Sequence, residues 1–226
     1  MKKIGLIGGI SWTSTIDYYK FINEGVNQKL GGLNSAEIVI DSINFASIQK
    51  VGWKNSYDLL LKSATKLKNY GVDTIVLCAN TAHLFKEKLE NQIQIPIISI
   101  ISATANKLKI NKLKTVALLG TKYTMELDFY KKKLASFGFE IIIPEKESVR
   151  DKIQHIVKNE LGKGDINKKS KDFFLSTINE LINDGAEGVI FGCTEIPLLL
   201  NQSDVSIPIF NTTEIHSKEI VKYILK

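Results

Sequence analysis

A cysteine, a threonine and a glutamate stand side by side in the segment Gly-Cys-Thr-Glu-Ile-Pro at positions 192–197. They follow an apolar run at 188–191, so the sequence predicts that Cys193 lies where a strand ends and a helical turn begins. A thiol at such a place can have a lowered pKa and serve as nucleophile or base, and Glu195 can relay its proton. A lone cysteine is more often a structural residue. The segment alone therefore leaves both interpretations open.

Two further polar segments follow predicted strands. Cys-Ala-Asn-Thr-Ala-His at 78–83 carries the amide of Asn80 and the hydroxyl of Thr81, which suit recognition of a carboxylate but could equally cap the next helix. Gly-Gly-Ile-Ser at 8–11 combines glycines with Ser11 before a helical pattern, which suits an anion or a tight capped turn. Neither Gly-x-Gly-x-x-Gly nor the Walker pattern occurs, so nucleotide binding is a minor interpretation.

The cysteines and histidines do not have the spacing of a metal site or a disulfide framework. The chain has two cysteines, Cys78 and Cys193, and three scattered histidines, His83, His155 and His216. No Cys-x-x-Cys or His-x-x-x-His pair occurs. We therefore expect reduced thiols, no metal and no cofactor held by such a cluster.

Composition is that of an ordinary soluble protein. The chain has 226 residues, 44% of them hydrophobic and 24% charged, with a formal net charge of +6. Its lysine clusters at 107–114, 131–133 and 168–171 have little aromatic interleaving, which predicts solvated surfaces rather than nucleic-acid binding. No apolar run has the length of a membrane span, and no signal-peptide core follows the first residues. We expect a cytoplasmic protein with no membrane partner.

Short apolar runs alternate with segments of helical period along the whole chain. Leu60, Ala64 and Leu67 follow the i, i+4, i+7 rule of a helix face, and Phe174, Ile178 and Leu181 do the same. Such alternation predicts an α/β architecture with mainly parallel sheets. The predicted strands are 4–7, 38–40, 74–77, 97–101, 115–119, 141–143, 188–191 and 207–210.

The second half of the chain repeats the first at a nearly constant offset. Gly8 matches Gly120, 112 positions later, within Ile-Gly-Leu-Ile-Gly and Val-Ala-Leu-Leu-Gly. Asp-Tyr-Tyr at 17–19, Gly-Val-Asp-Thr-Ile-Val at 71–76 and Ile-Pro-Ile at 95–97 also have counterparts in the same order. The repeat predicts two pseudo-symmetric lobes with the active site in the cleft between them, because open α/β sheets bind ligands at the carboxyl ends of their strands.

Together these motifs resemble the aspartate/glutamate racemase superfamily. The resemblance rests on Gly-Gly-Ile-Ser at 8–11, Asn-Thr-Ala-His at 80–83, Leu-Gly-Thr at 119–121 with Thr-Met at 124–125, and Gly-Cys-Thr-Glu-Ile-Pro at 192–197. It spans nearly the whole chain and is closest to bacterial aspartate racemases and their broad-specificity relatives. It implies a first lobe of residues 1–102 plus 209–226, a second lobe of residues 103–208, and a homodimer.

The resemblance also implies a mechanism and a set of site residues. Family members use neither pyridoxal phosphate nor metal, and a cysteine from each lobe exchanges a proton at the α-carbon of an amino acid. Cys193 matches the second cysteine, with Glu195 in support, and Cys78 is an uncertain first one. By motif position, the substrate-binding candidates are Ser11, Asn80, Thr81, Thr121 and Thr194. Lys163 and Gln49 lie in regions that would meet the distal group of the substrate, although Lys163 could equally be an exposed loop residue. His83 would orient the second motif or cap its helix.

The sequence departs from the family at one catalytic position. The family's first cysteine directly precedes Asn-Thr, where this chain has Ala79, and the internal repeat also sets Ala79 opposite Cys193. Cys78 could reach the substrate, or Ser11, Thr81 or water could serve the second face. The third alternative is a one-cysteine enzyme that protonates a single face, as the arylmalonate decarboxylases do. A non-catalytic small-molecule sensor is a further alternative to an amino-acid racemase.

Overall fold

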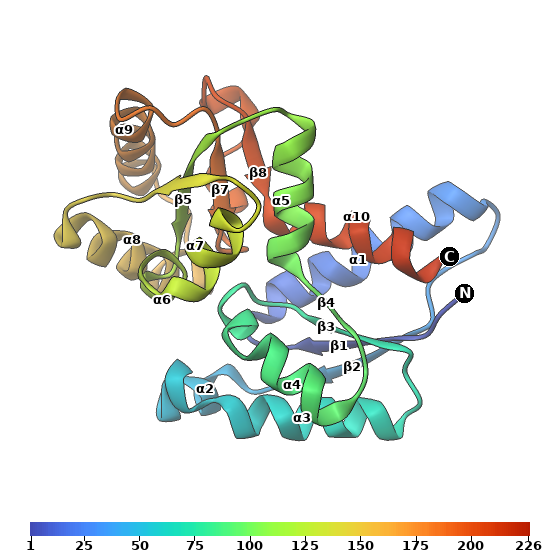
Figure 1. The fold of residues 1–226 in the computed structure, drawn as a ribbon. Helices are drawn as coiled ribbons and strands as arrows, with labels where there is room; N and C mark the ends of the chain where they lie inside the picture. The colour runs from blue at the N-terminus through green and yellow to red at the C-terminus, as the bar shows by residue number, and fades with distance from the viewer. The chain divides into compact units, whose positions relative to one another are not determined.

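The computed structural model describes residues 1–226, which form two compact units. Unit 1 comprises Met1–Ile100 and Thr213–Lys226, and unit 2 comprises Ile101–Thr212. Each unit is a four-stranded parallel sheet covered by helices, as Figure 1 shows. The predicted α/β class with two similar lobes and parallel sheets is therefore confirmed.

The sheet of unit 1 has the strand order β2-β1-β3-β4, and every neighbouring pair is parallel. Its strands are β1 (Ile4–Gly8), β2 (Ile38–Ser42), β3 (Thr74–Leu77) and β4 (Ile97–Ile98). Its helical segments are α1 (Trp12–Leu30), α2 (Phe45–Val51), η1 (Trp53–Asn55), α3 (Tyr57–Asn69), η2 (Thr81–Phe85), α4 (Lys86–Ile93) and, returning from the end of the chain, α10 (Thr212–Ile224).

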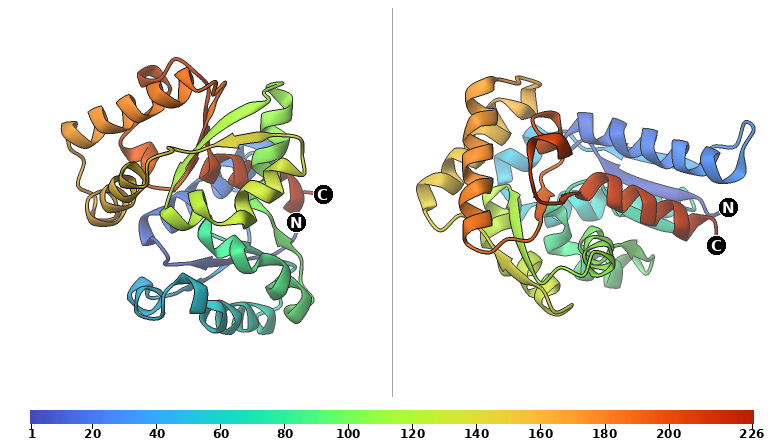
Figure 2. Two further views of the ribbon diagram at one scale, coloured as in Figure 1. Left: turned by 60° about the vertical axis from the view of Figure 1, so that its left-hand side comes forward. Right: turned by 90° about the horizontal axis from the view of Figure 1, so that it is seen from above.

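Helices cover both faces of the unit 1 sheet because its strands are apolar on both sides. On one face α1 and α10 lie side by side, as Figures 1 and 2 show, and bury Tyr18, Ile22 and Ile220 against the strands. On the other face α3 brings Leu67 so close to Gly5 that a β-carbon there would lie 3.0 Å from the leucine. The returning α10 thus completes the core of unit 1.

The sheet of unit 2 has the equivalent order β6-β5-β7-β8, again with parallel neighbours. Its strands are β5 (Thr115–Gly120), β6 (Glu140–Ile142), β7 (Val189–Gly192) and β8 (Ile209–Asn211). Its helical segments are α5 (Ile100–Ile110), α6 (Lys122–Glu126), α7 (Asp128–Ala135), α8 (Glu147–Asn159), η3 (Leu161–Lys163), α9 (Lys168–Asn183), η4 (Ile196–Leu198) and η5 (Gln202–Asp204).

The core of unit 2 lies between its sheet and the helices α8 and α9. Ile153 of α8 and Phe174 of α9 pack with Leu119 and Phe191 of the central strands, and all four side chains are buried. On the opposite side lie α5 and α7 (Figure 1), where the buried Tyr130 hydroxyl bonds to Thr104. Both faces of this sheet are therefore covered as well.

The helical and strand periods predicted from sequence match the elements closely, with one clear exception. Leu60, Ala64 and Leu67 lie on the buried face of α3. The predicted strand at 97–101 is wrong in its second half, because β4 ends at Ile98 and α5 begins at Ile100. A short isoleucine run has no periodicity that separates a strand from the buried first turn of a helix.

Two chain-wide properties complete the description. No helix is both long enough and apolar enough to cross a membrane. No group of three or more histidine, cysteine, aspartate or glutamate side chains is arranged so that it could hold a metal ion.

Candidate active site

The thiol of Cys193 and the carboxylate of Glu195 form a buried pair at the carboxyl end of β7. Cys193 Sγ donates a hydrogen bond to Glu195 Oε2 over 2.7 Å, and Thr194 Oγ1 donates to the same oxygen over 2.9 Å. Cys193 and Glu195 are each only 7% exposed. One carboxylate oxygen therefore accepts from two neighbouring side chains, and the predicted trio forms one hydrogen-bonded cluster.

The pair keeps the cysteine protonated. Burial raises the pKa of Cys193 well above its usual range, and the negative charge and hydrogen bond of Glu195 raise this pKa further. The lowered thiol pKa that the sequence analysis allowed for is therefore not found in this environment. A protonated thiol can donate a proton directly, whereas its use as a base requires Glu195 to accept the thiol proton first.

Unit 1 carries a compact turn at the carboxyl end of β1. Gly9 has a φ of +79°, and a β-carbon on it would lie 2.2 Å from the carbonyl oxygen of Ile43, so only glycine fits. Its N–H donates to Thr15 Oγ1 over 2.9 Å. Ser11 follows as the N-cap of α1 and accepts from the N–H of Ser14. The predicted capped turn is present, and Thr15 is a supporting residue that the sequence analysis missed.

Unit 2 has an equivalent cap at the carboxyl end of β5. Thr121 is the N-cap of α6 and accepts from the N–H of Thr124, and the two hydroxyls lie 3.0 Å apart. Gly120 pairs with Gly192 on the neighbouring strand. A β-carbon on Gly120 would lie 2.9 Å from the Gly192 carbonyl oxygen. The strand end that carries Thr121 therefore adjoins the strand end that carries Cys193.

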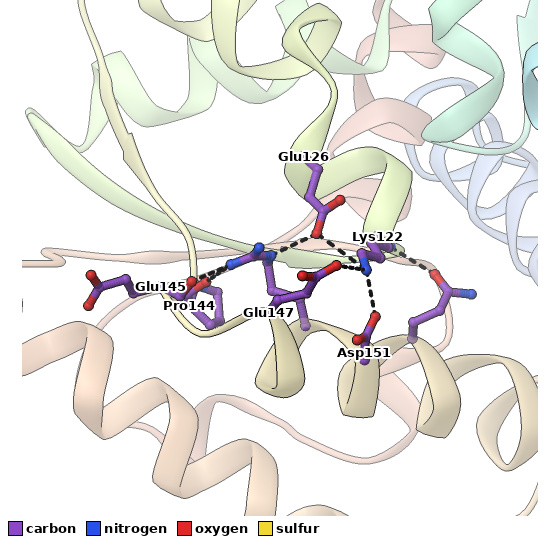
Figure 3. Close-up of polar contacts among 8 residues, drawn as sticks. Lys122, Glu126, Pro144, Glu145, Glu147 and Asp151 are labelled. Carbon is purple, nitrogen blue, oxygen red and sulfur yellow. Dashed lines mark hydrogen bonds and ion pairs between the residues drawn. The ribbon is translucent and has the colours of Figure 1, made fainter.

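An ion-pair network fastens α6 to α8 directly beside Thr121 (Figure 3). Lys122 Nζ lies 2.6 Å from Glu147 and 2.7 Å from Asp151, and the Lys122 N–H donates to Gln154. These acidic partners raise the pKa of Lys122. A second ion pair has its cation on α8 and its carboxylate on α6: Arg150 donates to Glu126 over 2.8 Å. Arg150 also binds the carbonyl groups of residues 144 and 145. Oppositely charged pairs thus run both ways between the two helices.

The strand registers fix which residues of the two units correspond. Gly5 pairs with Ile75 in unit 1, and Ala117, which lies 112 positions after Gly5, pairs with Val189 in unit 2. Val189 lies 114 positions after Ile75. The offset found by sequence matching is therefore reproduced in the hydrogen-bonded strand pairs.

By the same register, the residue of unit 1 that is equivalent to Cys193 is Ala79 and not Cys78. Cys78 corresponds to Gly192, the last residue of β7. Cys78 is 1% exposed and belongs to the apolar cluster beneath α1 and α10. Burial alone raises the pKa of its thiol far above the usual range. These contacts are those of a core cysteine.

The segment after β3 is buried and held by a histidine. Asn80 and Thr81 are 4% and 3% exposed, and the Asn80 side chain makes no capping bond to η2. His83 Nδ1 donates to the carbonyl oxygen of Ala79 over 3.0 Å. The predicted orienting contact of His83 on this segment is therefore present. Because β1 and β3 are parallel neighbours, the segment lies at the same sheet edge as Ser11.

Two predicted residues are exposed, unlike the buried clusters. Gln49 is an exposed residue of α2, and Lys163 is an exposed residue of η3. A further residue missed by the sequence analysis is Thr212, whose hydroxyl donates to the carbonyl oxygen of Phe191 over 2.8 Å. Its position directly after β8, where a strand ends, was the available signal.

The paired sheets with polar strand ends agree with the resemblance stated above. Residues 7–220 match the Asp/Glu/Hydantoin racemase family, and the chain belongs to that family.

Individual relatives span almost the full chain. The broad specificity amino-acid racemase RacX of Bacillus subtilis (strain 168) is 24% identical over 225 residues, which cover 96% of each chain. The crystal structure of an aspartate racemase homologue from Pyrococcus horikoshii OT3 is 35% identical, with a TM-score of 0.85 and complete coverage of both chains. The aspartate racemase of Picrophilus torridus, at 22% identity and a TM-score of 0.77, shares the fold over 99% of this chain and 95% of its own.

Proposed function

We propose that this protein is a cofactor-independent racemase of aspartate, glutamate or related amino acids, which moves the α-proton through the thiol of Cys193. The family supports amino-acid racemase activity. The observation that carries the thiol mechanism is the buried hydrogen bond from Cys193 Sγ to Glu195 Oε2. This bond gives one site both a proton donor and a carboxylate that can take the proton away.

The pair can work in both directions without any external acid or base. In the deprotonating direction, Glu195 accepts the Sγ proton and the thiolate removes the α-proton of the amino acid, which leaves its electron pair on the carbon. In the reverse direction, the Cys193 thiol gives its proton to that carbanion and recovers one from Glu195. Because the resting thiol is protonated, the donating step needs no prior proton transfer.

The carboxylate that neighbours the reacting carbon needs hydrogen-bond donors, because charge develops on it when the α-proton leaves. We assign this binding to Asn80, Thr81 and Ser11 of unit 1 and to Thr121 and Thr194 of unit 2. The exposed Lys163 and Gln49 are assigned to the distal group of the substrate, and a lysine there favours an acidic side chain. We further propose a cytoplasmic homodimer, on the strength of the family resemblance.

Ala79 indicates that the second catalytic group is not a cysteine. Since Ala79 replaces the family's first cysteine and Cys78 packs in the core, we propose a one-cysteine enzyme. The second face of the carbon is then served by a hydroxyl from Ser11 or Thr81, or by water. The same feature favours one further function, decarboxylation of a small dicarboxylic acid with protonation from one face.

Deuterium exchange tests this assignment. Both enantiomers of several amino acids are incubated with the purified protein in heavy water, with a metal chelator and a carbonyl-trapping reagent in parallel samples. We expect deuterium at the α-carbon and formation of the opposite enantiomer, unchanged by either reagent. Carbon dioxide release from a dicarboxylic acid would establish the decarboxylase instead. Saturable binding without exchange would refute the enzyme, and activity restored by an added cofactor would refute cofactor independence.

A further inference from the structure

Two buried histidines of unit 1 have no part in the proton transfer proposed above. His83 belongs to η2 and is 5% exposed, and His216 belongs to α10 and is fully buried. Burial is the main cause that lowers their pKa, to about 4 for His83 and about 3 for His216. Both imidazoles are therefore neutral at neutral pH, so each has one nitrogen that donates and one that accepts.

Hydrogen bonds fix which nitrogen of His83 carries the proton. Its Nδ1 faces the carbonyl oxygen of Ala79 at 3.0 Å, and a carbonyl can only accept. Its Nε2 receives the N–H of Ile100 at 3.1 Å. His83 is therefore the Nδ1–H tautomer, and it joins the segment after β3 to Ile100, which still belongs to unit 1.

His216 has the opposite tautomer. Its Nε2 donates to the carbonyl oxygen of Ile98 over 3.0 Å, and its Nδ1 receives the hydroxyl of Tyr18 over 2.8 Å. The rings of His83 and His216 are 5.7 Å apart in an edge-to-face arrangement, and the Tyr18 and His216 rings are 5.6 Å apart. Ile98 is the last residue of β4, two positions before Ile100, which binds His83.

These contacts form one continuous connection from the helices to a strand end. It runs from Tyr18 in α1 through His216 in α10 to the end of β4, and from there through His83 to Ala79. Its links are hydrogen bonds within buried or half-buried surroundings, except for the two residues of backbone that join Ile98 to Ile100. A buried hydrogen bond is costly to leave unmade. The connection ends on the residue that directly precedes Asn80 and Thr81.

We propose that Tyr18 and His216 are positioning residues, which hold the 79–81 segment in place for substrate through the end of β4 and His83. The proposal rests on the substrate-binding role assigned to Asn80 and Thr81. Neither residue is proposed to touch substrate or to move a proton. Their loss should therefore weaken substrate binding more than the chemical step at Cys193.

The substitution Tyr18→Phe tests this with a matched control in the other unit. It removes one buried hydroxyl and keeps the ring. Tyr130→Phe does the same in unit 2, where the hydroxyl bonds to Thr104. Both changes should lower thermal stability, because each removes a hydrogen bond between buried side chains. Only Tyr18→Phe should raise the KM of the exchanged amino acid, by about tenfold, with little change in kcat.

A second measurement requires no substrate. The chain has three histidines, so imidazole nitrogen-15 spectra are simple, and the exposed His155 is an internal reference. We expect an Nδ1–H tautomer at His83 and an Nε2–H tautomer at His216. In Tyr18→Phe the amide signals of residues 79–81 should shift, whereas in Tyr130→Phe they should not.

The two measurements separate this inference from the proposed enzyme. If the wild-type protein exchanges no amino acid, the proposed function fails, and the amide shifts still decide whether the connection reaches the 79–81 segment. Unshifted amides in Tyr18→Phe, different tautomers, or an equal rise in KM for Tyr18→Phe and Tyr130→Phe would each overturn the positioning role.

Discussion

At the scale of single residues, the two cysteines have similar burial and different surroundings. Cys78 packs in an apolar cluster of the core, whereas Cys193 donates to a carboxylate two positions away. Both thiols have a raised pKa, but only that of Cys193 is raised partly by a charged partner. The surroundings, and not the exposure of the sulfur, separate a reactive cysteine from a structural one here.

Replacement of each cysteine by serine should therefore have unequal effects. We expect Cys193→Ser to lower α-deuterium exchange at least about a hundredfold, because a hydroxyl is a far weaker acid than a thiol. Cys78→Ser should keep exchange from both enantiomers and lose about 1 to 3 kcal/mol of stability, because it buries a hydroxyl among apolar groups. Exchange and denaturant unfolding measure the two effects. Equal and complete loss of exchange in both variants would disprove the one-cysteine mechanism.

A second prediction concerns Glu195. Since the charge and the hydrogen bond of Glu195 both raise the pKa of Cys193, Glu195→Gln should lower that pKa. Thiolate absorbance as a function of pH measures this, in a Cys78→Ser background that leaves Cys193 as the sole thiol. Exchange should fall at least about tenfold, because the amide cannot accept the thiol proton. An unchanged or raised thiol pKa would show that the carboxylate does not govern the cysteine.

At the scale of elements, the sequence predicted most of the sheet and less of what surrounds it. Apolar runs and helical periods identify strands and helices because they reflect burial directly, and the Gly8 and Gly120 repeat correctly indicated two equivalent sheets. The strand predicted at 97–101 failed where a helix begins with buried isoleucines. The role of His216 could not be predicted, because its partners Tyr18 and Ile98 come from distant parts of the sequence. Thr15 bonds to the nearby Gly9 and Ser11, so its role was within reach of the sequence and was missed.

The geometry of the turn after β1 predicts that alanine at Gly9 destabilises the protein more than alanine at Gly71. Gly9 and Gly71 both have positive φ, but a β-carbon meets the Ile43 carbonyl only at Gly9, and nothing lies within 4 Å of it at Gly71. Gly71→Ala should cost about 1 to 2 kcal/mol, the price of a left-handed alanine. Gly9→Ala should cost at least about 3 kcal/mol, because the backbone must also move. Equal losses in denaturant unfolding would contradict the described turn.

The contacts between α6 and α8 should depend on salt. Lys122 meets Glu147 and Asp151 from another helix, whereas the exposed Lys132 pairs with Asp128 on its own helix. We expect Lys122→Met to lower the Tm more than Lys132→Met, since it breaks a network that joins two elements. High salt should reduce the difference in Tm between the two variants, because it screens ion pairs. A difference that persists unchanged in high salt would point to packing instead.

At the scale of the whole molecule, the buried histidines should limit stability in acid. In the folded protein the pKa of each histidine lies below the ordinary 6.5. As the pH falls, these histidines therefore bind protons in the unfolded chain before they do so in the folded protein. Their contribution to the free energy of unfolding is fully present above pH 6.5. It is lost as the pH falls toward their pKa values in the folded protein, about 4 and about 3. By pH 5 the loss should be about 2 kcal/mol per histidine.

Urea unfolding at several pH values between 7.5 and 5 measures this loss. His216→Gln should lower stability at pH 7.5 and flatten its dependence on pH, since one of the two depressed groups is gone. His155→Gln replaces an exposed histidine and serves as the control. A pH dependence that is the same in His216→Gln as in the wild type would exclude His216 as its source.

The returning helix α10 has a consequence for how the protein is made. Unit 1 takes its residues from both ends of the described chain, and the N–H of Lys2 even bonds to the carbonyl of Ile224. During translation, all of unit 2 leaves the ribosome before the strands of unit 1 can receive the helix that seals them. Until then the face that α1 shares with α10 stays partly uncovered, so we expect nascent unit 1 to be more prone to aggregation and chaperone binding than unit 2.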